Sequence, residues 1–199
     1  MKTHEHDFSA WADKILLYFP IDMPPDFYAS QFDRWRYIEP AFRLGNKVLE
    51  IGAQTCLACI YLKLRYPDLL VVASDIHPLV CKLASVRIKR WETDVPVVRC
   101  DAFHLPFKDD AFDVVFSEGL HEHFEVEDVV GLVAECSRVA RFQIIDVPTR
   151  LDLECGGGYG DERRRFYSEW GELFRSIEGV RVLEEFQRGT RYGVILERR

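Results

Sequence analysis

The stretch VLEIGAQTC, from Val48 to Cys56, constrains the fold more than any other part of the sequence. It combines a short apolar strand, an acidic residue, a glycine turn and the start of a helix. Open α/β folds bind their ligands where such turns lie, at the carboxyl ends of parallel strands. The turn contains Gly52, but Gln54 and Cys56 stand at two positions where turns of this kind usually have glycine.

Two further carboxylates follow the next predicted strands. Asp75 ends a predicted strand at 69–75, and Asp101 follows another at 95–100. With Glu50, they line one edge of a parallel sheet. A carboxylate at the end of the second strand suits the two hydroxyls of a ribose, so this edge predicts a nucleoside-containing ligand.

Strands and helices alternate along most of the chain. Predicted strands at 47–51, 69–75, 95–100, 112–117 and 142–147 alternate with predicted helices at 55–65, 77–91 and 127–138. Two predicted helices precede them, at 8–19 and about 28–43, and the end contains a helix at 168–176 and two runs, 179–187 and 191–198, that can form an antiparallel hairpin. The alternation predicts an α/β fold of the Rossmann-like three-layer αβα type with a mostly parallel sheet.

Several local features carry their own predictions. The helix at 77–91 has a predicted basic outer side of Lys82, Arg87, Lys89 and Arg90. Ser168 is the predicted cap of the last helix, and residues 138–141 form the predicted turn before the fifth strand. The polar loop 148–167 is either an acceptor-binding lid, with Tyr159, Tyr167 and the basic run Arg163–Arg165, or a mobile solvated loop.

Composition excludes some classes of protein. The net charge of −7 argues against a broad nucleic-acid surface. We expect no membrane span, because no window of about 18 apolar residues exists. The first residues do not resemble a signal peptide, so we expect a cytoplasmic protein whose six cysteines are reduced thiols. Cys56 and Cys59 form a CxxC motif, but without a second pair it does not indicate a metal site.

Four segments resemble the class I S-adenosylmethionine-dependent methyltransferases: VLEIGAQTC, VVASDIHP, RCDAFHLPFKDDAFDVVFSEGLHEHF and ECSRVARFQIIDVP. The resemblance covers about Lys47 to Pro148, and DAFHLPF followed by FDVVFS is typical of the branch that methylates small molecules such as quinones. It implies a seven-stranded sheet of order 3-2-1-4-5-7-6 with strand 7 antiparallel, S-adenosylmethionine (SAM) as cofactor and S-adenosylhomocysteine as product. Residues 46–199 would form the SAM-binding domain, and residues 1–45 would form an N-terminal helical cap.

The resemblance also implies roles for particular residues. Cofactor contacts are expected from Glu50, Gly52, Ala53, Asp75, Ile76, Asp101, Ala102, Ser117 and Glu118. Glu50 would lie near the methionine amino group, Asp75 at the ribose and Asp101 at the adenine. Methyl transfer demands no fixed catalytic residue, but His121 and His123 are candidates for a general base. The HEH triplet that contains them could alternatively bind a metal or serve structure alone.

Other functions remain open from the sequence. The substituted glycine turn also suits a catalytically inactive relative that binds a nucleoside ligand or a partner protein. A nicotinamide-dependent oxidoreductase is disfavoured because the GxGxxG pattern is missing. A nucleic-acid methyltransferase is disfavoured by the acidic balance. We therefore expect a small-molecule methyl acceptor, no nucleic-acid partner and no metal.

Overall fold

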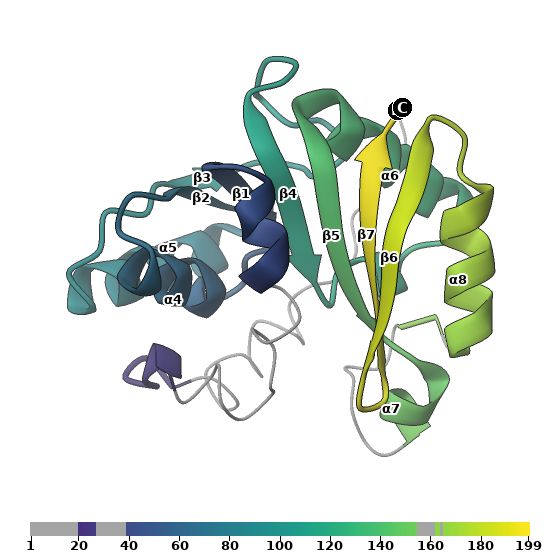
Figure 1. Ribbon diagram of the computed structural model, residues 1–199. Coiled ribbons are helices and arrows are strands. Elements are labelled where there is room, and N and C mark those ends of the chain that lie inside the picture. The colour runs from purple at the N-terminus through teal and green to yellow at the C-terminus, as the bar shows by residue number, and fades with distance from the viewer. Residues whose placement is uncertain (1–19, 27–38, 155–161, 164) are drawn as a thin grey trace.

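The computed structural model describes residues 20–26, 39–154, 162–163 and 165–199 (Figure 1). The predicted helix at 8–19 and most of the one at 28–43 lie outside the described residues, as do Cys155, Tyr159 and Arg164. Residues Glu39–Leu44, at the end of the second predicted helix, form a 3-10 helix, η1. The predicted division into a cap and a SAM-binding domain stays a prediction.

A seven-stranded sheet forms the centre of the molecule, as predicted. Its strands are β1 (Lys47–Ile51), β2 (Leu70–Asp75), β3 (Val97–Arg99), β4 (Phe112–Glu118), β5 (Ala140–Pro148), β6 (Val180–Arg188) and β7 (Arg191–Arg198). The order is β3-β2-β1-β4-β5-β7-β6 (Figure 1). Strands β1 to β5 are parallel, and β7 runs antiparallel to both β5 and β6. The predicted fold class and strand order are confirmed.

Helices cover both faces of the sheet, which makes three layers. They are α4 (Leu57–Arg65), α5 (Pro78–Arg90), α6 (Val126–Val139), α7 (Arg150–Glu154) and α8 (Tyr167–Ser176), with a 3-10 turn, η2 (His121–His123). Alternate residues of β1 enter different cores: Val48 packs with α4 and α5, and Leu49 packs with α6 and α8. Burial of both faces explains why the strands read as continuous apolar runs. In the described ranges, no helix is both long and apolar enough to cross a membrane.

The structure corrects two predictions near α6 and β3. The predicted turn at 138–141 does not exist, since α6 ends at Val139 and β5 begins at Ala140. The guanidinium of Arg138 donates to the carbonyls of Leu105 and Phe107, which holds this junction against the loop before β4. Strand β3 is shorter than predicted and begins only at Val97, because Pro96 has no N–H to donate to the ladder; it ends at Arg99.

Two further corrections concern the segment after β5. The predicted loop 148–167 begins with a helix, α7. Ser168 does not cap α8, because the helix begins at Tyr167 and Ser168 lies inside it. The carboxylate of Glu169 instead accepts the backbone N–H of Phe166 at 2.5 Å, which is the acidic half of a capping box.

Candidate functional site

The turn between β1 and α4 keeps the backbone of a glycine turn although only one of its three left-handed residues is glycine. Gly52 has φ 63°, Gln54 has φ 48° and Cys56 has φ 61°. The left-handed region is unfavourable for residues with a Cβ, at about 1–3 kcal/mol each when the surroundings hold them there. The chain therefore follows the course that glycines would give, although two of the three residues carry side chains.

Hydrogen bonds from β2 hold this turn. The N–H of Ala53 donates to the carbonyl of Ser74 at 2.8 Å, and the N–H of Cys56 donates to Ala53 at 2.7 Å. Asp75 accepts the N–H of Gln54 on one carboxylate oxygen at 3.1 Å and that of His77 on the other at 2.9 Å. Burial raises the pKa of Asp75. The predicted ribose-binding acid is thus also part of the scaffold of the turn.

Glu50 lies beneath the turn and is buried. The thiol of Cys59, in the first turn of α4, donates to its carboxylate at 2.8 Å. Burial raises the pKa of Glu50 from 4.5 to about 8, and the charges of Glu118 and Asp75 add to this effect. The structure therefore brings three predicted site acids, from β1, β2 and β4, within electrostatic reach of one another.

Asp101 and its neighbours lie at the end of β3, beside Asp75. The N–H of Cys100 donates to the Asp75 carbonyl at 3.0 Å. Asp101 accepts the N–H of Phe103 at 2.9 Å and stays partly exposed. Ile76, the predicted adenine contact, is exposed. The predicted residues after β2 and β3 are thus neighbours with surface open to a ligand.

The end of β4 approaches the same turn. A Cβ on Gly52 would meet the Leu120 side chain at 3.1 Å, so glycine allows this close approach. Ser117 and Glu118 are both buried here. The predicted sites on β1 and β4 therefore meet at one edge, since Glu50 pairs with Phe116 in register.

The two candidate bases differ in their surroundings. His121 is 1% exposed, and its Nδ1 lies 3.1 Å from the Ser117 hydroxyl. Its Nε2 is buried with no hydrogen-bond partner among the described residues. Burial lowers the pKa of His121 to about 3, so the ring is neutral and a weak base at pH 7. His123 is buried too, with Nε2 4.0 Å from the Glu122 carboxylate.

A buried ion network that the sequence reasoning missed lies behind Glu118. Asp146 on β5 is fully buried and accepts hydrogen bonds from Arg188, at 2.8 Å, and from Arg191. Arg188 also reaches Glu118 at 3.1 Å. Although burial favours the protonated acid, Arg191 and Arg188 outweigh it and lower the pKa of Asp146. The sequence does contain a signal for this network: an acid lies inside the apolar strand FQIIDV, and a buried charge requires a partner.

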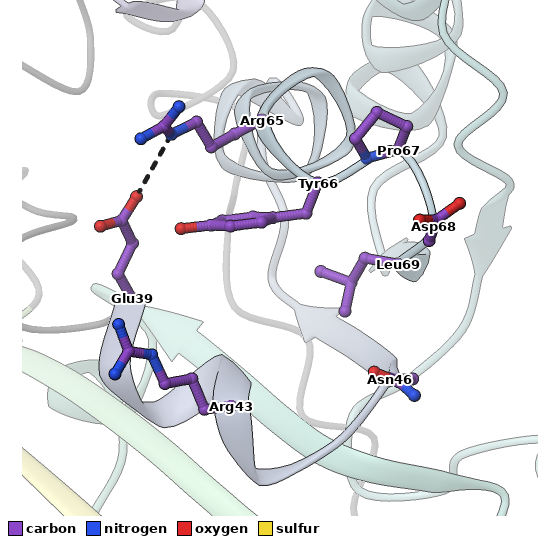
Figure 2. Close-up of a pocket in the computed structure, with 8 residues that line it drawn as sticks. All are labelled: Glu39, Arg43, Asn46, Arg65, Tyr66, Pro67, Asp68 and Leu69. Atoms are coloured by element: carbon purple, nitrogen blue, oxygen red, sulfur yellow. Dashed lines mark ion pairs between the residues drawn. The ribbon is translucent and has the colours of Figure 1, made fainter.

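Two other features do not add to the site. A cavity of about 390 Å³ opens near the amino ends of β1 and β2, at the opposite end of the strands from the predicted site. There Glu39 faces Arg65 at 3.8 Å beside the ring of Tyr66 (Figure 2). None of the predicted cofactor residues lines it. In the part of the chain that the structure describes, no group of three or more metal-ligating side chains is arranged around a common point, and Cys56 and Cys59 are buried free thiols.

The sheet order and the helices on both faces define a Rossmann-like α/β protein, and the left-handed turn and the strand-end acids lie together at the carboxyl ends of its strands. A family model described as Methyltransferase domain matches residues 49–142. This match and the fold support the identification of the chain as a class I SAM-dependent methyltransferase, and they imply SAM as its cofactor.

Solved structures share the fold at low sequence identity. The PH0226 protein from Pyrococcus horikoshii OT3 is 17% identical, with a TM-score of 0.78 over 95% of this chain and 98% of that one. A SAM-dependent methyltransferase from Aquifex aeolicus is 19% identical, with a TM-score of 0.73 over 93% and 97%. A Thermotoga maritima SAM-dependent methyltransferase, described as a possible histamine N-methyltransferase, is 15% identical, with a TM-score of 0.69 over 96% and 100%. No curated protein matches the chain.

The residues present fit SAM. The turn keeps the left-handed backbone at all three positions, so the side chains of Gln54 and Cys56 have not changed its course. The Cys56 side chain is fully buried in the core with the residues of α4. Carboxylates stand near the end of β1 and at the end of β2, and a carboxylate can accept hydrogen bonds from an amino group or from ribose hydroxyls.

Proposed function

We propose that this chain is an active SAM-dependent methyltransferase whose acceptor is a small molecule. The observation that carries the proposal is the turn at Gly52, Gln54 and Cys56, which keeps the backbone of a cofactor turn despite its substitutions. The inactive alternative rested on those substitutions and finds no support. The DAFHLPF and FDVVFS motifs favour a small-molecule acceptor, and the name of the Thermotoga maritima protein also points to one, histamine.

In this proposal each strand end holds one part of the cofactor. Asp75 would accept the ribose hydroxyls on the lone pairs that Gln54 and His77 leave available. Asp101, with the N–H of Ala102, would bind the adenine edge, and Ile76 would pack on its ring. Gly52 and Ala53 would lie under the cofactor.

The methionine end would lie between β1 and β4. Glu50 would bind the amino group once its carboxyl loses the proton that burial favours. Ser117 and Glu118 would flank the same part, with Arg188 holding the carboxylate of Glu118 in place.

When bound, SAM supplies a methyl group activated by a sulfonium. The contribution of the chain is to hold the acceptor in line with that methyl and to exclude water. His121 is neutral and buried, so it would orient Ser117 and not accept a proton. The role of general base, where the acceptor needs one, falls to His123.

Thermal unfolding with SAM, S-adenosylhomocysteine and NAD tests the cofactor assignment. A ligand at 100 times its Kd stabilises the folded state by about 2.7 kcal/mol, which would raise Tm by roughly 5–10 °C. We expect this rise with SAM and its product but not with NAD. Asp75→Asn should weaken binding roughly tenfold or more, whereas exposed Asp68→Asn should leave it unchanged.

Turnover is tested separately, with a panel of small amines, phenols and carboxylates and release of S-adenosylhomocysteine as the readout. Product release that depends on one acceptor class would support the proposal. Tight cofactor binding without turnover on any acceptor would favour the inactive relative instead. Stabilisation by NAD alone would replace both with a dinucleotide-binding protein.

A further inference from the structure

Arg87 is the one residue of the predicted basic outer side of 77–91 that the structure places in the interior. It is fully buried on α5, so its predicted position was wrong. Its guanidinium donates to three carbonyls: Thr55 at 2.9 Å, Pro20 at 2.6 Å and Ile21 at 3.4 Å. A buried cation is costly unless it is hydrogen-bonded, so these contacts determine where the side chain lies.

The contact with Thr55 acts on the centre of the cofactor turn. Thr55 is buried and lies between Gln54 and Cys56, the two residues held in the left-handed region. Asp75 holds one side of this segment through the N–H of Gln54. Arg87 holds the peptide group that joins Thr55 to Cys56, through the carbonyl of Thr55. The turn is therefore clamped where its backbone is least favourable.

The same guanidinium binds the segment Pro20–Met23. Its Nη2 donates to the Pro20 carbonyl, which also accepts the N–H of Met23 at 3.0 Å. The Met23 side chain packs against the core that contains α4 and α5. One side chain thus joins the segment that follows the predicted helix at 8–19 to the turn at the cofactor edge.

We propose that Arg87 is a positioning residue for cofactor binding, which holds the substituted turn in its binding conformation and couples it to the segment Pro20–Met23. Gly at position 54 would adopt this conformation without the steric cost that Gln54 pays, so the clamp matters more in this chain than in one with a glycine turn. The inference rests on the proposed function in one respect, that the cofactor binds at this turn.

The first test compares Arg87→Met, Arg87→Lys and the exposed control Arg90→Met. Isothermal titration with S-adenosylhomocysteine measures affinity, and hydrogen exchange of the ligand-free protein follows the amides of Cys56 and Met23. We expect Arg87→Met to raise Kd roughly tenfold and to speed exchange at both amides. Arg87→Lys, which keeps the charge but reaches fewer carbonyls, should be intermediate, and Arg90→Met should match the wild type.

The second test asks whether a glycine replaces the clamp. Gln54→Gly in the Arg87→Met background should return Kd to within roughly threefold of the wild type, because the turn no longer needs holding. Exchange at Met23 should stay fast, because its anchor is still missing. A purely structural Arg87 would lower stability without this selective rescue.

Three outcomes would overturn the inference. They are a Kd for the folded Arg87 variants within twofold of the wild type, unchanged exchange at Cys56, and no rescue by Gln54→Gly. If Arg87→Met does not fold, Arg87→Lys carries the same comparison. If the wild type binds no S-adenosylhomocysteine, the proposed function fails, while exchange at Cys56 and Met23 still decides whether Arg87 holds the turn and the segment Pro20–Met23.

Discussion

Single residues in this site combine binding with support of the backbone. Asp75 holds the turn through Gln54 and is also the predicted ribose acceptor. Glu50 accepts a hydrogen bond from the thiol of Cys59 and is also the predicted partner of a cofactor amine. Such double roles would make the site sensitive to the protonation of its acids, because the same groups stabilise the fold and are predicted to meet the ligand.

At this scale we predict the pH dependence of stability that Glu50 causes. Its pKa is raised to about 8 in the folded protein, so the folded state keeps a proton that the unfolded state loses near pH 4.5. The contribution of Glu50 to the free energy of unfolding is therefore fully present below pH 4.5. It is lost as the pH rises from 4.5 toward 8, by at most about 1.4 kcal/mol per pH unit. Glu50→Gln removes the titration, so its stability relative to the wild type should be greater at pH 8 than at pH 5.

Urea unfolding at the two pH values measures this difference. The exposed residue Glu127 offers a matched control, and Glu127→Gln should keep a constant offset from the wild type. A constant offset for Glu50→Gln as well would show that Glu50 ionises normally in the folded protein.

At the scale of elements, two glycines in regular structure have opposite surroundings. Gly193 on β7 pairs with Phe186 on β6, and a Cβ at this position would overlap the Phe186 ring. Gly131 lies on the exposed side of α6, where a Cβ would meet nothing within 4 Å. The first glycine makes room for an aromatic side chain, while nothing in the structure explains the second.

We therefore expect alanine to have opposite effects at these positions. Gly193→Ala should destabilise the protein by about 1–3 kcal/mol, because the hairpin must shift to accommodate the methyl group. Gly131→Ala should stabilise it by about 1 kcal/mol, because alanine favours the helix. Denaturant midpoints of the two variants provide the measurement, and equal effects would contradict the account of Gly193.

At the scale of the whole molecule, the ion network ties the terminal hairpin to the cofactor edge. Arg188 and Arg191, from β6 and β7, meet Asp146 on β5 and Glu118 on β4. The antiparallel hairpin, far from β1 in the sequence, thereby supports the strand end beside the predicted methionine site.

Asp146→Asn should accordingly cost about 3–5 kcal/mol of unfolding free energy, because it leaves the buried guanidinium of Arg188 and the partly buried one of Arg191 without their shared acid. The exposed pair of Arg150 and Glu154 is the control, and Glu154→Gln should cost less than about 1 kcal/mol. If Asp146→Asn lowered the free energy of unfolding as little as the control does, other groups or water would be supplying the hydrogen bonds of the two arginines.

The predictions that succeeded rest on local patterns, and those that failed depend on distant partners. Apolar strands alternating with helices led to the sheet, and the family resemblance supplied its strand order, which the structure confirms. Arg87 was assigned to the outer side of its helix because helical periodicity cannot show that Pro20 and Thr55 lie against that side. The network at Asp146 was missed because its partners are more than 40 residues away in the chain.

The sequence by itself determined the class of fold, the edge at which ligand binding is predicted and the acids that stand there, because hydrophobic periodicity and strand-end positions are local properties. The tertiary structure decided that Gln54 and Cys56 keep the backbone of a glycine turn. It did so because the strain of a left-handed residue is offset by contacts with β2 and α5, from Asp75 and Arg87, which only folding brings to the turn.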